Sequence, residues 1–163
     1  MKLKKDPRSR DLDFELWVLI RQTSTALFRA RRRALKPYGI LPRQAAVLQA
    51  IQSIGKEATP AKISRWVFRE PHTVSFMLNV MQREGLITKT KDLERKNLVR
   101  VSLTPKGREI YHYVRKREEI HKTIGCLSQE QRKQLRSLLN VVIDEAIKQA
   151  GISQKRDFPP AEG

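Results

Sequence analysis

The chain has 163 residues, with 34 Lys or Arg against 17 Asp or Glu and a formal net charge of +17. This length suits one domain, or one lobe with an oligomerisation arm. The charge favours polyanionic partners, nucleic acid ahead of an anionic membrane surface. No apolar stretch is long enough to span a bilayer, and a single cysteine excludes a disulfide framework.

The first forty residues combine a short basic segment with a long helix. Residues 1–10 are polar and basic, and we expect them to be flexible. Acidic residues interrupt the apolar run that follows, and no small-residue cleavage site is present, so we expect no signal peptide and a cytoplasmic location. From Asp11 to Lys36 apolar side chains recur at steps of three and four, which predicts one helix about 39 Å long. Because a compact lobe does not need such length, residues 11–40 are predicted to form a dimerisation helix.

Proline and glycine divide the middle of the chain into shorter helices. A second helix is predicted from Pro42 to Gly55 and a fourth from Pro71 to Gly85. Between them, Thr59 supplies the capping residue of a short third helix.

A hairpin and two helices are predicted after the fourth helix. Strand candidates at 86–91 and 98–103 flank a highly charged tip. Thr104 caps a fifth helix that is predicted to run to about residue 124. Ser128 and Gln131 form a capping box for a last helix, and the tail at 151–163 is expected to be irregular.

This order of elements predicts a mainly α protein with a small β-hairpin wing (α+β). A winged helix-turn-helix DNA-binding lobe at 41–104 is predicted between the dimerisation helix at 11–40 and C-terminal dimerisation helices at 105–150. Hydrophobic content of 39% is low for a self-contained globule. Some of the apolar burial is therefore expected to come from a partner subunit.

The predicted fourth helix has one apolar and one polar face. At about 100° per residue, Val74, Met77, Leu78 and Met81 fall on the core side. The other side carries groups that can reach bases and phosphates: His72, Thr73, Ser75, Phe76, Asn79 and Arg83. An ordinary solvated face is the alternative. The preceding short helix and tight turn, the exposed aromatic side chain and the wing behind it favour a helix that reads double-stranded DNA.

The charged hairpin tip lies next to this helix. Lys91, Arg95 and Lys96 are the candidate contacts to the minor groove or to phosphate. The alternative is a solvated hairpin tip that binds nothing.

Several motifs between Leu41 and Leu139 occur together. They are LPRQAAVLQAI in the second helix, Pro-x-Thr-Val at 71–74, REGLI at 83–87, VSLTPKG at 101–107 and LSQE at 127–130. With these motifs and its long first helix, most of the chain resembles the MarR (multiple-antibiotic-resistance regulator) family of winged helix-turn-helix transcription regulators.

The resemblance implies a triangular homodimer in which the outer helices entwine and two winged lobes face a palindromic operator. Two departures from the family occur at the predicted interface. The wing's usual Asp-x-Arg pair is replaced by Arg95 and Asn97, and Phe76 stands where a basic residue is common.

The resemblance also implies a repressor that a small aromatic or anionic effector releases from DNA. The effector cleft is expected between the dimerisation helices and the lobe, with Phe28, Tyr38, Gln44 and Tyr111 as candidate lining residues. A plain core or interface role for these four side chains is the alternative.

The remaining reactive side chains point to no chemistry. Cys126 is expected to be a small packing residue rather than a redox sensor. His121 is expected at the surface or an interface, and a buried, hydrogen-bonded histidine is favoured over a metal ligand there. No catalytic residue, metal ligand set or cofactor motif is found, so we expect no enzyme. The competing function is a sequence-tolerant basic DNA-binding protein of the nucleoid type, which the ratio of operator to random-DNA affinity distinguishes from a specific regulator.

Overall fold

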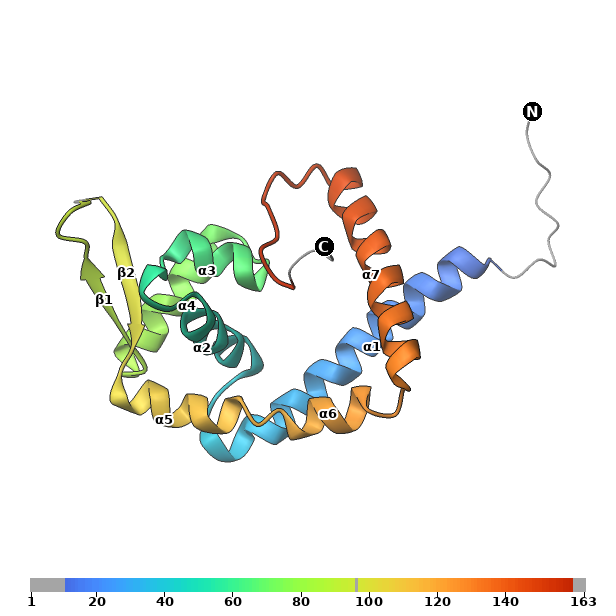
Figure 1. Cartoon of the computed structure of the whole chain (residues 1–163), viewed down its shortest axis with the longest axis horizontal. Helices are drawn as coiled ribbons and strands as arrows, with labels where there is room; N and C mark the ends of the chain where they lie inside the picture. Colours follow the sequence, from blue (N-terminus) through green and yellow to red (C-terminus); the bar gives the residue numbers. More distant parts are fainter. Residues whose placement is uncertain (1–10, 96, 160–163) are drawn as a thin grey trace.

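Seven α-helices and a two-stranded antiparallel sheet make up the fold, which the computed structural model describes for residues 11–95 and 97–159 (Figure 1). In chain order the elements are α1 (Leu12–Leu35), η1 (Lys36–Tyr38), α2 (Pro42–Ile54), η2 (Gly55–Glu57), α3 (Pro60–Val67), α4 (Pro71–Arg83), β1 (Ile87–Lys91), β2 (Val99–Leu103), α5 (Pro105–Val114), α6 (Glu118–Ile124) and α7 (Gln129–Gln149), where η1 and η2 are single 3-10 turns. The prediction of a mainly helical fold with a hairpin wing is confirmed.

Local capping explains where several helices begin. The Thr59 side chain accepts the Lys62 N–H at the start of α3, and the Thr104 side chain accepts the Gly107 N–H at the start of α5. Ser128 caps α7 with the predicted capping box. Each side chain satisfies an N–H group that the first helical turn leaves without a partner, so these boundaries follow from local sequence.

The wing is a regular hairpin joined to the lobe. β1 and β2 pair in register from Ile87 opposite Leu103 to Lys91 opposite Val99. On the other edge of β2, the Val101 N–H donates to the Ala58 carbonyl at 3.0 Å. Val101 and Leu103 are buried and Ser102 between them is exposed, as the alternation of a strand requires. The hairpin therefore packs one face on the helices and leaves the other to solvent.

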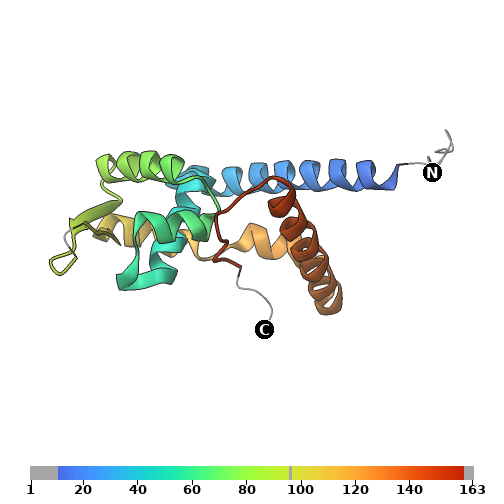
Figure 2. The same ribbon diagram turned by 90° about the horizontal axis from the view of Figure 1, so that it is seen from above.

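The hydrophobic core belongs to the lobe. The fully buried apolar side chains come from α2, α3, α4, the wing and the adjoining ends of α1 and α5; they include Leu35, Val47, Leu48, Ile63, Val74, Leu78, Met81, Ile87 and Val114. Among described residues, α7 has no buried side chain and α1 has only Leu35. We call α6, α7 and residues 12–30 of α1 the arm (Figure 2). No helix of the described ranges is long and apolar enough to cross a membrane.

The prediction of one continuous fifth helix is wrong, because the structure has two helices there, α5 and α6. Arg117 between them adopts a left-handed conformation with φ 53°, which costs a non-glycine residue about 1–3 kcal/mol. Contacts from distant residues stabilise the break. The Arg31 guanidinium donates to the Val114 carbonyl at 3.0 Å, and the Arg117 guanidinium donates to Gln49.

The segment after α7 is irregular up to residue 159, but it is docked on the lobe. It crosses from the arm back to α3 (Figure 1). Asp157 pairs with Arg65 at 2.8 Å, and the Phe158 and Trp66 rings stack at 4.3 Å between centroids. Gln154 donates to the Ser64 hydroxyl at 2.8 Å. The lobe and the end of the arm are thus connected by a second route besides α1 and α5–α6.

Candidate nucleic-acid interface

α4 buries one face and exposes the other. Val74, Leu78 and Met81 are fully buried, so the orientation of the helix about its axis is fixed by the core. The candidate base-reading and phosphate-binding side chains are all exposed: His72, Thr73, Ser75, Phe76, Asn79 and Arg83. Phe76 is 66% exposed. The arrangement presents a polar face with one aromatic ring on an α-helix, an element that the major groove of B-DNA can admit.

The turn between α3 and α4 sets the angle at which α4 leaves the lobe. Phe68 ends α3 in a left-handed conformation with φ 50°. The buried Ser64 hydroxyl donates to the Arg69 carbonyl at 2.6 Å, and the Arg69 N–H donates back to the Ser64 carbonyl. Pro71 then occupies the first helical position of α4. This turn is the tight connection of a helix-turn-helix.

Asn79 is not free on the surface of α4. Its Oδ1 accepts a hydrogen bond from the Lys89 ammonium of β1 at 2.6 Å. Partial burial lowers the pKa of Lys89 from its ordinary value. The contact links α4 to the wing through the Asn79 amide oxygen.

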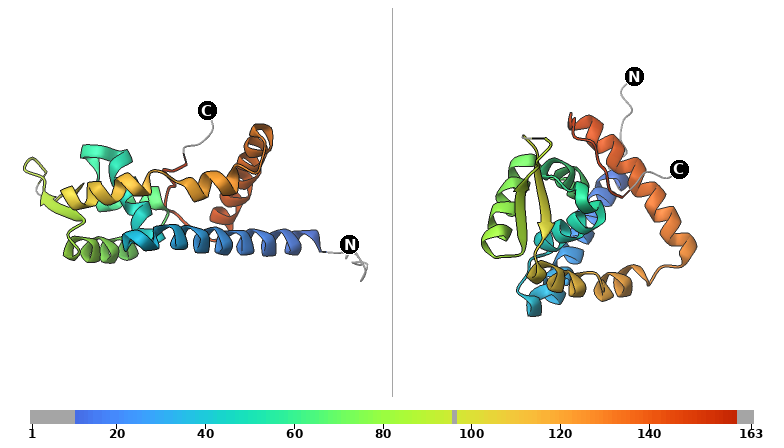
Figure 3. Two further views of the ribbon diagram at one scale, coloured as in Figure 1. Left: turned by 90° about the horizontal axis from the view of Figure 1, so that it is seen from below. Right: turned by 60° about the vertical axis from the view of Figure 1, so that its left-hand side comes forward.

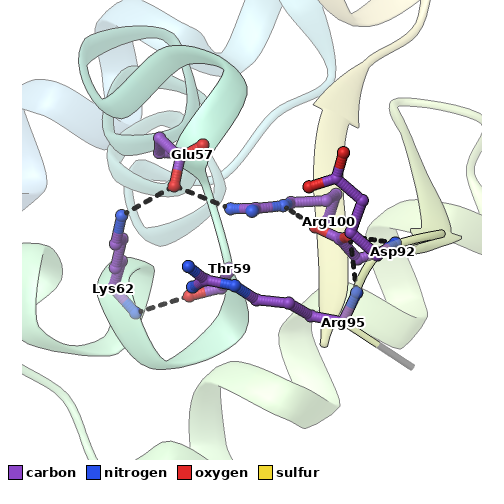
Figure 4. A network of polar contacts seen from close by, with 7 residues as sticks. Glu57, Thr59, Lys62, Asp92, Arg95 and Arg100 are labelled. Atoms are coloured by element: carbon purple, nitrogen blue, oxygen red, sulfur yellow. Dashed lines mark hydrogen bonds and ion pairs between the residues drawn. The ribbon is translucent and has the colours of Figure 1, made fainter. Parts of the chain in front are cut away.

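Asp92 organises the tip of the wing. Its Oδ1 accepts the backbone N–H groups of Glu94 and Arg95 at 2.9 and 3.0 Å, and its Oδ2 accepts from the Arg100 guanidinium at 2.8 Å. Arg100 also donates to Glu57 at 3.0 Å, and Lys62 reaches the same Glu57 oxygen at 3.4 Å (Figure 4). The chain of contacts ties the tip of the wing to the start of α3.

The charges of this network reinforce one another. The Arg95 backbone N–H and then the Arg100 guanidinium hold the pKa of Asp92 below its ordinary value. The hydrogen bond from Arg100 does the same for the pKa of Glu57, and the Arg100 pKa is raised in return. Both carboxylates are therefore ionised at neutral pH. Although the Asp-x-Arg pair is replaced in this chain, Asp92 still positions the wing, through the backbone of Arg95 and through Arg100.

The predicted wing contacts lie at or near the tip. Lys91 and Arg95 are exposed, and so is Asn97. Lys96, the third predicted contact, lies outside the described residues. Glu57 and Arg100 were not among the contacts predicted from the sequence. Their contact joins residues 43 positions apart, so no local pattern signals it.

The four candidate effector residues do not line one cavity. Phe28 lines a hollow of about 420 Å³ between α1 and α6, together with Leu27, Ile120 and Ile124. Tyr38 stacks on Tyr113 at 4.5 Å and lines a neighbouring hollow of about 310 Å³.

Gln44 and Tyr111 have other contacts. Gln44 is buried, accepts the Leu41 N–H at 2.9 Å and donates to Glu84 at 2.7 Å. Tyr111 packs against the core and donates to Gln49 at 3.4 Å. For these two side chains the structure supports the alternative, a role in packing the lobe.

The structure bears on two further predictions. The packing role of Cys126 is wrong in the single chain, because Cys126 is exposed and its thiol donates to the Thr123 carbonyl at 3.0 Å. His121 is exposed, which agrees with a surface or interface position and not with a buried one. Both lie in the arm, which has almost no protein interior in one chain, so helical periodicity did not correspond to burial there.

Comparison with known proteins agrees with this geometry. Residues 41–107 match the winged helix DNA-binding domain family. The organohalide-sensing transcriptional regulator RdhR, in its 2,4-dichlorophenol-bound form, is similar with a TM-score of 0.82 and 26% identity, covering 100% of this chain and 99% of RdhR.

Two DNA complexes share the fold at 21% identity. S. aureus MepR with DNA has a TM-score of 0.72, covering 78% of this chain and 94% of MepR. A mutant MarR from E. coli with operator DNA has a TM-score of 0.73, covering 82% of this chain and 99% of MarR. No curated protein matches the chain significantly in sequence.

Proposed function

We propose that the chain is a MarR-family transcription regulator that binds a palindromic operator as a homodimer. Residues 41–107 match the winged helix DNA-binding domain family, and the fold is that of MarR structures. In this proposal it acts as a repressor in the cytoplasm, and a small aromatic effector releases it from DNA. The observation that carries the proposal is the outward face of α4, which exposes Phe76 and five polar side chains while its opposite face is fully buried.

Dimerisation is supported by apolar surface that one chain leaves in water. On α1, Phe14 and Trp17 are about 60% exposed, and on α7, Leu138 and Val141 are about two-thirds exposed. A soluble protein does not keep contiguous apolar surface of this kind uncovered. A second copy of the arm supplies matching apolar faces, because the contact in a twofold dimer is self-complementary.

We propose that side chains of α4 contact the bases and that side chains of the wing contact the DNA backbone. Ser75, Phe76 and Asn79 face the major groove, where an aromatic ring can contact a thymine methyl and an amide can pair with adenine. The Asn79 Oδ1 accepts from Lys89 and has a second lone pair that can accept from a base, so Lys89 orients the amide and couples base reading to the wing. Arg95 and Lys96 contact phosphate or the minor groove beside the half-site.

Effector release is proposed to act through the contact between Arg31 and Glu119. This ion pair joins α1 to α6, and both residues line the Phe28 hollow and the Tyr38 hollow. The Phe28 hollow is mainly apolar, which suits an aromatic ring. A ring bound there changes the separation of α1 and α6, and with it the spacing of the two lobes. The ligand then shifts the population towards dimers whose lobes no longer match successive major grooves.

The test is a set of binding isotherms over a range of salt, on operator and random duplexes. Asn79→Ala is expected to cost about 1–3 kcal/mol on the operator and little on random DNA. Arg95→Ala is expected to weaken both duplexes alike and to reduce the salt slope by about 0.9 per lost contact. Arg115→Ala, an exposed cation at the far end of α5, is the control.

Two outcomes would overturn parts of this proposal. Equal wild-type affinity for operator and random DNA would favour the sequence-tolerant architectural protein. If 2,4-dichlorophenol and related phenols bind neither the wild type nor Phe28→Ala in calorimetry, and leave DNA affinity unchanged, the aromatic effector is excluded at this hollow.

A further inference from the structure

One face of α1 carries positive charge that the interface described above does not use. Near the end of the helix, four cations fall within an arc of roughly 100°, at about 100° per residue: Arg29, Arg32, Arg33 and Lys36. We call these four residues the α1 basic face. All four are exposed, and they border an open hollow of about 520 Å³ next to the start of α2. Within the part of the chain that the structure describes, no ion pair involves any of them.

Helix stability explains only part of this face. Cations in the last turn interact favourably with the helix dipole, and Arg32 and Arg33 lie in that turn. Arg29 lies a turn earlier, where the dipole effect has fallen off. In addition, α1 has no acidic residue after Glu15 that could form i,i+4 pairs with these arginines. Four cations on one helix face repel one another, so the face is stabilised when an anion approaches it.

The α1 basic face points to the same side of the molecule as the exposed face of α4. Arg31 pairs with Glu119, and Leu27 shares a hollow with Ile120, so α6 covers the side of α1 opposite to the α1 basic face. Figures 2 and 3 show α4 and α1 following one another in a single layer, with α5 and α6 in a second layer. Because α4 turns its buried residues toward the lobe core, its exposed face also points away from that second layer.

We propose that the α1 basic face binds the phosphate backbone of the operator between the two half-sites. This inference rests on the proposed function, because it takes the dimer and its operator as given. Along the long axis of the molecule the order is wing, α4, α1 and then the apolar end of the arm (Figure 1). In the dimer, the wing therefore lies on the outer side of each half-site, and the α1 basic face lies toward the twofold axis. The phosphates that it meets are those of the operator centre.

Removing cations from the α1 basic face is expected to reduce the salt dependence of DNA binding strongly. Each phosphate contact contributes about 0.9 to the slope of log K against log salt. Replacing Arg29 and Arg33 in both protomers removes four cations, so the slope is expected to fall by up to about 3.6. Because these contacts carry no base information, the ratio of operator to random-DNA affinity is expected to stay nearly constant.

The experiment combines the double variant R29Q/R33Q with duplexes that carry neutral methylphosphonates. One duplex has neutral groups at the central phosphates and another has them at the outer flanks. Central neutralisation is expected to weaken the wild type at least tenfold, but to weaken R29Q/R33Q less than threefold. The control is R115Q/K122Q, which removes two exposed cations from the end of α5 and from α6 and is expected to lose as much affinity as the wild type on the central duplex.

The outcomes separate this inference from the proposed function. If the wild type prefers its operator but central neutralisation has no effect, the proposed function stands and this inference is overturned. Equal sensitivity of R29Q/R33Q and the wild type to the central duplex overturns it as well. If the wild type shows no operator preference, the proposed function itself fails. Circular dichroism and light scattering establish that R29Q/R33Q remains a folded dimer; if it does not, Arg29→Lys and Arg33→Lys restore the charge and must restore the central sensitivity.

Discussion

The winged lobe and the arm differ in the solvent exposure of their apolar side chains. In the lobe, Val47, Leu48 and Leu78 are fully buried in a core that one chain completes. In the arm, Trp17 and Leu138 remain about 60% and 66% exposed, although they lie on equally regular helices. Helix formation is therefore not what distinguishes the two regions. They differ in whether the residues that cover the apolar face belong to the same chain.

The largest expected effect comes from placing a charge on the apolar face of the arm. Leu138→Asp is expected to raise the dimer dissociation constant at least about 100-fold, because two buried leucines are lost per dimer and two charges are desolvated. Light scattering over a concentration series measures the change, and operator affinity falls with it. Leu93→Asp, on a wing leucine that is 96% exposed, is the control and should remain dimeric. A Leu138→Asp protein that stays dimeric would contradict a role for α7 in the interface.

A cavity in the lobe is expected to have a smaller effect, on a different quantity. Leu78→Ala should lower the free energy of unfolding by about 2–5 kcal/mol, because Leu78 is fully buried. Urea denaturation measures this loss, while the dimer dissociation constant should change little. Phe76→Ala, on the exposed face of the same helix, should change stability by less than about 0.5 kcal/mol. A large stability loss for Phe76→Ala would mean that this side chain is covered.

The docked C-terminal segment joins the two regions, and its loss is expected to cost less. Phe158→Ala removes the stack on Trp66, which is worth about 0.5–1.5 kcal/mol. In a Trp17→Phe background Trp66 is the only tryptophan, and its fluorescence should shift to longer wavelength as the ring becomes hydrated. Unchanged emission and unchanged proteolysis of the segment would show that it does not dock on α3 in solution.

The smallest expected effect is the acid response of the wing network. The pKa values of Asp92 and Glu57 are lowered in the fold, so their contribution to stability is present above their ordinary pKa values. It is lost as pH falls through the lowered values, below about pH 4. Carboxyl chemical shifts over a pH titration report both groups. Arg100→Gln should raise the Glu57 midpoint more than the Asp92 midpoint, because Asp92 keeps its bonds from the Arg95 and Glu94 backbone. A Glu57 titration that the variant leaves unchanged would exclude the contact with Arg100.

Local signals were sufficient for most of the lobe. Thr59, Thr104 and Ser128 mark helix starts because their side chains accept N–H groups within three residues. The two faces of α4 follow from a period of 3.6 residues, and the hairpin register follows from alternation along β1 and β2. These features depend on neighbours in sequence, so the sequence carries the information directly.

The errors and the missed features concern contacts between distant residues. The break at Arg117 depends on Arg31, which occupies the Val114 carbonyl from α1, and on Gln49 in α2. The brace of the wing depends on Glu57, and the order of the C-terminal segment depends on Trp66. The exposure of Cys126 and His121 reflects the open arm. None of these contacts has a signature in sequence spacing.

By itself the sequence determined the order of helices, the hairpin, the outward face of α4 and the excess of positive charge, because each follows from short-range periodicity, capping or composition. Only the tertiary structure decided which charges are used within the fold and which remain free. Arg31 and Arg100 are held by carboxylates, whereas Arg29 and Arg33 are exposed on the side that α4 faces. The physical reason is that a cation's role depends on the anion that the fold brings near it, and chain folding places those anions tens of residues away.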